Sequence, residues 1–195
     1  MNMNTHRINS KSQISKAALD LFIKKGIKAT TTSEIAKKAG VAEGTIYRHF
    51  KSKNDIASEL FLNYMDMFKD RLSEAEKKFN EPRESIKKMI RVFFEFAKNE
   101  PKAYDYIMAG HYSELPKMTS NFLKPKDVFV NAIKKGIAKG DFTKMDENLG
   151  AALVIGMITR SILFFNSGFI ANDYENIVSE VTKAALKVLS KEQPI

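Results

Sequence analysis

The sequence predicts an all-α fold in which a short helix-turn-helix module precedes a larger set of helices. Apolar residues recur every three or four positions through most of the 195 residues, and this is the period of a helix buried on one face. No segment shows a convincing alternation of apolar and polar residues, the pattern of a half-buried β-strand. Hydrophobic residues make up 44% of the chain, so it can bury a real core as one large domain or two small ones.

The first two helices have clear ends in the sequence. Residues 11–25 place apolar side chains on one helical face, and Gly26 supplies the left-handed residue that a helix C-terminus favours. Thr31 and Glu34 match a capping box, in which a hydroxyl and a carboxylate accept hydrogen bonds from free backbone N–H groups. A short helix over 32–39 is therefore predicted to follow.

A turn and a third helix complete the N-terminal module. Gly40 breaks the second helix, Val41 fills the corner, and a third short helix is predicted over about 43–50. Two short helices joined by a turn, after a longer supporting helix, form the helix-turn-helix arrangement. In that arrangement the second short helix enters the major groove of DNA.

Positive charge is concentrated in the same region. Residues 1–60 contain 11 Lys and Arg against 5 Asp and Glu, which accounts for six of the nine net positive charges. Excess positive charge suits a polyanion such as nucleic acid or an anionic membrane. A solvated, lysine-rich surface would explain the charge equally well, so the charge supports a DNA partner without deciding it.

Six further helices are predicted in the remainder of the chain. Pro82 and Pro101 each open one of them, Gly140 ends another, and residues 110–125 are irregular. The predicted helical spans are 54–79, 82–98, 101–108, 126–139, 146–167 and 174–190.

The span 146–167 is the most apolar and raises the question of a membrane. Its run of ten apolar residues, 149–158, is followed by the three polar residues 159–161, and it falls short of the roughly 20 residues that a bilayer requires. We therefore predict a buried helix and no membrane partner. Residues 1–9 lack the apolar run of a signal peptide, so the cytoplasm is the expected compartment.

Several enzyme classes need residues that this sequence lacks or disperses. The chain has no Cys, which excludes disulfides and thiolate metal sites, and its three His form no Glu-x-x-His or His-x-x-x-His pair. We find no nucleophile with its base and no phosphate-binding loop. We therefore predict a protein that is not an enzyme and has no catalytic residue, metal site or cofactor, with a helical-bundle enzyme as the alternative.

The strongest functional signal is the run TTTSEIAKKAGVAEGTIYRHFKSKNDI over residues 30–56. It resembles the signature of the TetR/AcrR family of bacterial one-component transcriptional regulators almost position for position. The family pattern I-A-x-x-A-G-V corresponds to residues 35–41, and the pattern G-T-aliphatic-Y-x-(aromatic or His)-F corresponds to residues 44–50. A Lys followed by an aliphatic residue completes the pattern at 53–56.

The resemblance implies two domains and a function. A helix-turn-helix DNA-binding domain is expected over residues 1–53, with an arm at 1–9, and a ligand-binding and dimerisation domain over 54–195. The expected function is that of a repressor that a small apolar or aromatic effector releases from a palindromic operator in double-stranded DNA. A ligand-independent architectural DNA-binding protein is the alternative.

Eight residues in this motif are candidate DNA contacts: Thr32, Glu43, Gly44, Thr45, Tyr47, Arg48, His49 and Lys53. Gly44 costs a helix about 1 kcal/mol relative to Ala, and a close approach of the helix backbone to DNA would justify that cost. A simple helix cap is the other interpretation of this glycine. Thr45 offers a hydroxyl to a phosphate or base edge and a methyl group to thymine.

The remaining candidates divide into phosphate contacts and departures from the family pattern. Tyr47 and His49 resemble the pair of residues with which the family contacts phosphate. Thr32 and Lys53 each stand at a helix start, where free N–H groups gather around an anion. Ala42 replaces the Ser or Thr that often caps the recognition helix, and Glu43 repels phosphate but can accept a hydrogen bond from cytosine N4.

The resemblance also implies a dimer interface and a ligand pocket in the C-terminal part. Helices 146–167 and 174–190 are expected to pair with their copies, with Val181 and Ala185 in the interface and an intramolecular core as the alternative. The helix 54–79 is expected to couple the pocket to DNA binding. The candidate pocket residues come from the aromatic middle of the chain: Phe93, Phe94, Tyr104, Met108, His111, Tyr112, Phe122 and Phe129.

Overall fold

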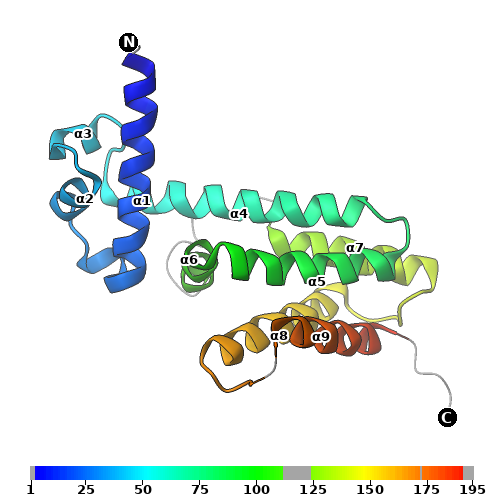
Figure 1. The fold of residues 1–195 in the computed structure, drawn as a ribbon. Coiled ribbons are helices and arrows are strands. Elements are labelled where there is room, and N and C mark those ends of the chain that lie inside the picture. The colour runs from blue at the N-terminus through cyan, green and yellow to red at the C-terminus, as the bar shows by residue number, and fades with distance from the viewer. Residues whose placement is uncertain (1–2, 112–123, 172, 191–195) are drawn as a thin grey trace. The chain divides into compact units, whose positions relative to one another are not determined.

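The computed structural model describes residues 3–111, 124–171 and 173–190, and this part of the chain is helical with no strand (Figure 1). The all-α prediction is therefore confirmed. The helices are α1 (Met3–Ala29), α2 (Thr32–Ala39), α3 (Glu43–Tyr47), α4 (Lys53–Lys77), α5 (Pro82–Asn99), α6 (Pro101–His111), α7 (Pro125–Lys139), α8 (Glu147–Asn166) and α9 (Tyr174–Leu189).

The boundaries of the first helices differ from the predicted ones in two places. α3 ends at Tyr47, whereas the prediction extended to about residue 50. α1 begins at Met3, so residues 3–9 continue the helix where an arm was expected. These residues are mostly polar but include no Gly or Pro that would stop a helix. Gly26 interrupts α1 as predicted, with φ 81° and ψ 159°, and the Thr30 hydroxyl then donates to the Gly26 carbonyl at 2.9 Å.

The described residues pack into two compact units, and the first takes in Met1–Met65 and Glu100–Asn121. In this unit α1 contacts α2, α3 and α6. Phe22 on α1 stacks on Tyr106 of α6 at 6.3 Å, and the Tyr106 hydroxyl donates to the Ala57 carbonyl of α4 at 2.9 Å. Burial, together with the neighbouring Tyr64, raises the pKa of the Tyr106 hydroxyl, so this buried bond keeps its proton.

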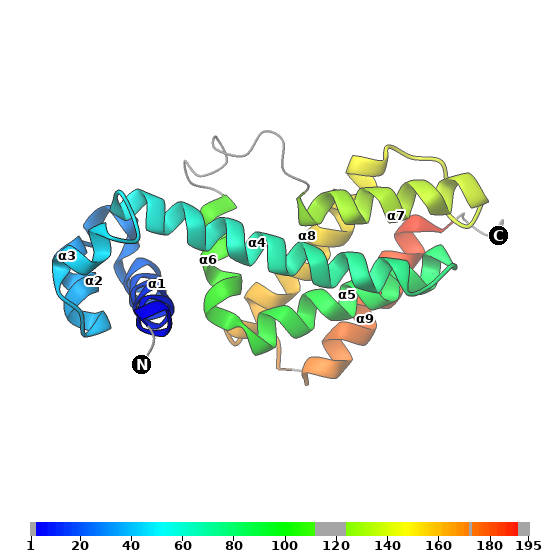
Figure 2. The ribbon, with the colours of Figure 1, turned by 90° about the horizontal axis from the view of Figure 1, so that it is seen from above.

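The second unit takes in Asp66–Asn99 and Phe122–Ile195, and α5 is its central helix. α5 contacts α7, α8 and α9, and the C-terminal part of α4 runs beside it (Figure 2). α5 also carries the long buried stripe that the sequence predicts, with Ile86, Ile90 and Phe93 on it. The core of this unit is therefore built on three sides of one amphipathic helix.

The turn after α7 is held by a close approach between two residues. Phe142 is 1% exposed, and its ring lies against the Cα of Gly136, where a Cβ would overlap it. The Thr143 N–H then donates to the Leu189 carbonyl at 2.8 Å, which joins this turn to the end of α9. The backbone of Gly136 is helical, so a glycine is required here by the lack of space for a Cβ and not by a left-handed conformation.

The most apolar helix, α8, corrects one prediction. It was expected to be a buried helix, but only 28% of its most apolar 18 residues are buried. Among the described residues it is also the one helix long and apolar enough to cross a membrane. One side packs on α5, α7 and α9, while Leu149, Leu153 and Phe164 are exposed. Large apolar residues lie on both sides of this helix, so the sequence pattern did not show which side is covered.

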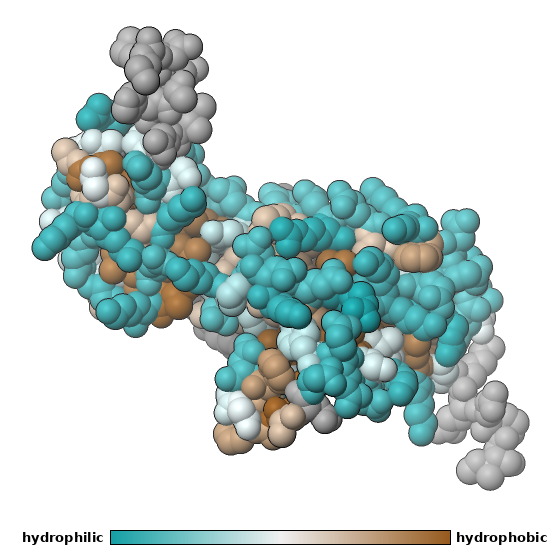
Figure 3. Space-filling view, in the orientation of Figure 1, coloured by the Kyte–Doolittle hydropathy of each residue, from teal (hydrophilic) through white to brown (hydrophobic). Residues whose placement is uncertain are grey.

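The same unit corrects the expected interface positions. Val181 and Ala185 on α9 are 8% and 0% exposed inside the protomer, so the second interpretation, an intramolecular core, holds for both. The exposed apolar surface instead continues from α8 to its C-terminal turn, where Phe169 is 77% exposed and packs edge-on against Phe164 (Figure 3).

Replacing Gly136 with Ala should destabilise the protein. The new methyl group would force the Phe142 ring out of its packed position, which costs about 1–3 kcal/mol and exceeds the helix-propensity gain of Ala. We expect Tm to fall by about 3–10 °C in thermal unfolding followed by circular dichroism. Asn131→Ala, on an exposed position of α7, is the control and should leave Tm nearly unchanged. An unchanged Tm for Gly136→Ala would contradict the packing described here.

Candidate nucleic-acid interface

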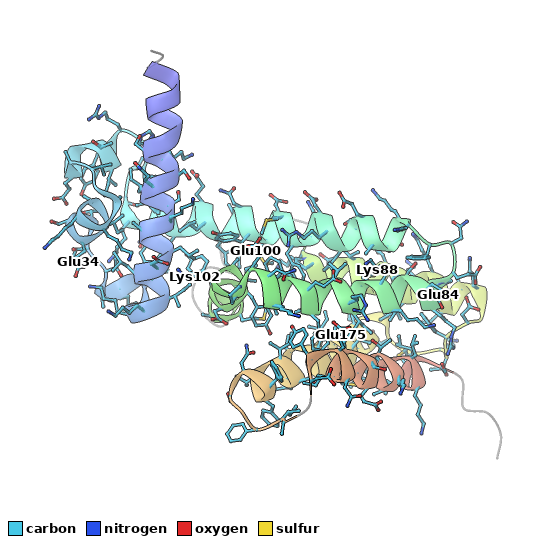
Figure 4. All side chains as sticks on the ribbon, in the orientation of Figure 1. Glu34, Glu84, Lys88, Glu100, Lys102 and Glu175 are labelled. Carbon is cyan, nitrogen blue, oxygen red and sulfur yellow. The ribbon has the colours of Figure 1, made fainter. Side chains whose placement is uncertain are left out.

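The start of α2 is fixed by the predicted capping box. The Glu34 N–H donates to the Thr31 hydroxyl at 3.2 Å, and the Thr31 N–H donates to the Glu34 carboxylate at 2.9 Å. Figure 4 shows Glu34 at this end of α2. The Lys25 ammonium, 2.6 Å from the same carboxylate, and the Thr31 donors lower the pKa of Glu34 to about 2. The box therefore stays charged and closed at neutral pH.

The turn between α2 and α3 depends on Gly40. This residue has φ 68° and ψ 33°, the left-handed conformation that glycine adopts without strain. The Val41 N–H donates to the Ala36 carbonyl at 3.0 Å and turns the chain toward α3. Ala42 then precedes α3 with no side-chain cap, as its identity predicts.

α3 is only five residues long and is held by buried neighbours. Ile46 is 0% exposed and Phe50, just after the helix, is 4% exposed. Both the His49 and the Phe50 N–H groups donate to the Ile46 carbonyl at 2.9 Å. The opposite side of α3 carries Tyr47, which is 57% exposed, so the helix has one anchored face and one face open to a partner.

Three of the candidate contacts form one hydrogen-bonded group on that open face. The Thr32 hydroxyl, at the start of α2, donates to the Glu43 carboxylate at 2.6 Å. The same hydroxyl lies 3.3 Å from the Tyr47 hydroxyl. We call Thr32, Glu43 and Tyr47 the hydroxyl–carboxylate group. It joins the first residue of α2 to the first residue of α3, at the surface where the sequence predicts contact with DNA.

Gly44, Thr45 and Arg48 lie beside this group. The Arg48 guanidinium donates to the Thr45 hydroxyl at 3.1 Å, which holds a long basic side chain over α3. Gly44 is exposed, its φ is not in the left-handed region, and a Cβ built on it would meet nothing within 4 Å. The fold of the free protein therefore does not require a glycine at position 44.

His49 and Lys53 have partners that the sequence did not reveal. The His49 Nε2 lies 2.8 Å from the Ser10 hydroxyl of α1. The Lys53 ammonium donates to the Lys28 carbonyl at 3.1 Å and to the Thr30 carbonyl at 2.5 Å, at the end of α1. Both side chains, predicted as phosphate contacts, thus also tie the helix-turn-helix to α1.

Comparison with known proteins identifies this arrangement. The family model described as "Bacterial regulatory proteins, tetR family" matches residues 14–60. A fatty acid metabolism regulator protein of Bacillus subtilis is 26% identical over 182 residues, which cover 91% of this chain and 92% of that protein. The chain therefore carries a DNA-binding domain of the TetR family at residues 14–60. It is a DNA-binding transcriptional regulator of the helix-turn-helix type.

Solved TetR-family structures share the fold over nearly the whole chain. A regulator from Marinobacter aquaeolei superposes with a TM-score of 0.83 at 17% identity, covering 97% of this chain and 100% of that one. FadR from Bacillus subtilis, in complex with stearoyl-CoA, superposes with a TM-score of 0.78 at 24% identity, covering 91% of this chain and 98% of that one. The C-terminal helices, where the sequence showed only compatible lengths, therefore follow the family fold as well.

The candidate pocket residues do not form one group in this chain. Phe93 packs edge-on against Phe68 at 4.7 Å and lies 6.4 Å from Phe129, between α4, α5 and α7. The next residue, Phe94, faces the other way and contacts Tyr174 of α9 at 5.6 Å. Consecutive residues on a helix point in different directions, so these two phenylalanines line different clusters.

The other candidates belong to the first unit or lie outside the described residues. Tyr104 is buried and Met108 half-buried on α6. The side chain of His111, and the residues Tyr112 and Phe122, lie outside the part of the chain that the structure describes. In that part no group of three or more His, Cys, Asp or Glu side chains is placed to hold a metal ion.

Two sets of contacts were not found by sequence reasoning. Ser10 and Lys11 of α1 face the DNA-binding helices: Lys11 lies 5.3 Å from the Phe50 ring and pairs with Glu59 at 2.8 Å. They precede Ile14 by four and three positions, so the helical period would have placed them on the same face. Arg71 of α4, half-buried and 5.6 Å from the Phe96 ring, has no such signal.

Replacing Gly44 with Ala separates the two interpretations of this glycine. If Gly44 serves the approach to DNA, the variant should fold at least as stably as the wild type, because Ala favours a helix by about 0.5–1 kcal/mol. Its affinity for operator DNA should fall about tenfold or more, because the methyl group holds α3 away from the base edges. Thermal unfolding and fluorescence anisotropy measure the two effects. Lower stability with unchanged DNA affinity would show that Gly44 is a structural cap.

Proposed function

We propose that this regulator is a repressor that binds a palindromic operator as a homodimer and leaves it when a small apolar or aromatic effector binds. The observation that carries the DNA-binding part is the open side of α3 away from the buried Ile46, where Tyr47 and the C-cap residue Arg48 are exposed and Thr45 is half-buried. Such a regulator acts where the chromosome is, in the cytoplasm. As a DNA-binding regulator it needs no catalytic residue or cofactor.

The contacts divide by chemistry. Thr32 and Tyr47 offer hydroxyl protons to phosphate, which positions the protein without selecting a sequence. Thr45 and Arg48 can reach base edges, where Arg favours guanine. An ammonium has three N–H donors, and Lys53 uses two on the Lys28 and Thr30 carbonyls, which leaves a third for phosphate. His49 is the remaining proposed phosphate contact.

Selection from random DNA tests this proposal. Two recognition helices related by a two-fold axis need half-sites about one helical turn apart, so the enriched sequence should be a near-palindrome. Tyr47→Phe should weaken binding to operator and random DNA alike, by about twofold to tenfold, and Thr45→Ala should also change base preference. Salt-sensitive binding with no enriched sequence would favour the architectural protein instead.

The proposed dimer interface uses α8 and α9, as TetR-family regulators are dimeric. The exposed apolar residues of these helices indicate which of their faces is available for a contact with a second copy. Leu149, Leu153, Leu163 and Phe164 form an exposed, mainly apolar stripe along α8 that also includes the exposed Arg160, and Val188 is exposed on α9. An exposed surface with this many large apolar residues is typical of a protein–protein contact, and a second copy presents the same surface. We therefore propose a second copy as its cover in place of a membrane.

A charge on the stripe should separate the dimer without unfolding the protomer. Leu153 is 42% exposed, so Leu153→Glu leaves the carboxylate in water in the monomer, whereas a dimer would bury it unpaired at a cost of several kcal/mol. Sedimentation should show monomer at low micromolar concentration with unchanged circular dichroism. Asn131→Glu on α7 is the matched control and should stay dimeric. A dimeric Leu153→Glu variant would place the interface elsewhere.

The proposed effector is apolar, and the relatives suggest which molecules to test first. The Bacillus subtilis relative is a fatty acid metabolism regulator, and FadR of the same species has been solved with stearoyl-CoA. The aromatic cluster around Phe93 and Phe129 would suit an acyl chain.

α4 runs without a break from Lys53 to Lys77, so it supplies residues to both units and is our candidate for the coupling element. Phe79, the last residue of the predicted helix 54–79, lies beyond α4 and is 37% exposed.

Titration with stearoyl-CoA or stearate, with and without operator DNA, tests the effector. An effector that prefers the DNA-incompetent state should weaken operator binding by roughly 5- to 150-fold, and operator should weaken effector binding by the same factor. Isothermal calorimetry and anisotropy measure the two sides of this linkage. Equal effector affinities in both titrations would show that these molecules do not regulate the protein.

A further inference from the structure

The hydroxyl–carboxylate group has a defined direction of proton donation. A carboxylate only accepts, so the 2.6 Å bond between Thr32 and Glu43 uses the single hydroxyl proton of Thr32. The 3.3 Å contact with Tyr47 must then use the Tyr47 proton, with the Thr32 oxygen as acceptor. The chain of donation runs from Tyr47 through Thr32 to Glu43. Both hydroxyl protons are therefore directed inward, toward Glu43.

The local fold does not need this contact. α2 is already capped by Thr31 and Glu34, whose two backbone bonds close its first turn. α3 is held by the burial of Ile46 and Phe50. Within the described part of the chain no Lys or Arg nitrogen lies within 4.0 Å of the Glu43 carboxylate, so its negative charge is unpaired and exposed. Glu43 thus places an anion on a surface that is proposed to meet phosphate.

We propose that Glu43 is an internal competitor of the DNA phosphates. In the free protein its carboxylate accepts the hydrogen bonds that a phosphate oxygen accepts in the complex. DNA of any sequence must displace it before Thr32 and Tyr47 can turn outward. Glu43 therefore lowers the affinity for operator and random DNA by a similar factor. This inference rests on the proposed contacts of Thr32 and Tyr47 with phosphate.

Affinity measurements on Glu43→Ala test the competition. Releasing the two hydroxyl groups should tighten binding to the selected operator and to a random duplex of equal length by about threefold to tenfold each. Glu43→Gln, whose amide oxygen can still accept from Thr32, should give a smaller gain. Glu59→Ala removes a carboxylate from the same unit away from this group and also frees Lys11, so its gain sets an upper limit for the general effect of lost negative charge.

The double variant Thr32→Val, Tyr47→Phe provides the decisive background. Without the two hydroxyl groups, adding Glu43→Ala should tighten binding no more than Glu59→Ala does. An equal gain in both backgrounds would overturn the competition and leave only charge repulsion. Weaker binding of Glu43→Ala to operator alone would overturn it in favour of a base contact, such as cytosine N4.

The same variants also show whether Thr32 and Tyr47 contact phosphate at all. If the Thr32→Val, Tyr47→Phe variant binds DNA as tightly as the wild type, the two hydroxyl groups do not contact phosphate, and both the contacts and the competition are wrong. If that variant binds weakly and Glu43→Ala brings no gain in the wild-type background, the contacts stand and only the competition is wrong. Circular dichroism of each variant confirms that α3 remains folded.

Discussion

The DNA-facing chemistry of this protein depends on the burial of two side chains. A five-residue helix has no stability of its own, because helix nucleation is costly and only a few backbone bonds form. α3 exists because Ile46 and Phe50 are fixed in the core of the first unit. The positions of Thr45, Tyr47 and Arg48 follow from that anchorage. The hydrophobic contact on one side of the helix thus sets the polar geometry on the other.

Local signals in the sequence were sufficient for the elements of this module. The capping box of Thr31 and Glu34 and the end of α2 at Gly40 follow from residue types three or fewer positions apart, and both are present as predicted. The partners of His49 and Lys53 lie 39 and 23 to 25 residues away in sequence. No local pattern encodes such tertiary contacts, so sequence reasoning placed both side chains in the DNA interface alone.

The C-terminal part shows a second limit of sequence patterns. From the aromatic composition of this region, Phe93 and Phe94 were expected to line one pocket. In the structure Phe93 packs against Phe68, whereas Phe94 packs against Tyr174 in a separate cluster. Likewise, an apolar helix such as α8 could be identified but its covered side could not, because both sides are apolar. Where a single charged residue, such as the exposed Arg160, interrupts a largely apolar face, the sequence pattern is weak and packing decides which side meets solvent.

The bonds of Lys53 have a mechanical consequence. Its ammonium joins the first residue of α4 to the carbonyl groups of Lys28 and Thr30, and Thr31, the next residue, caps α2. Charge-assisted bonds of this kind resist stretching more than neutral ones do. A displacement of the first turn of α4 would therefore carry the α1–α2 junction with it. Force applied through α4 would therefore reorient α2 and α3 together, while Ile46 and Phe50 stay buried in the first unit.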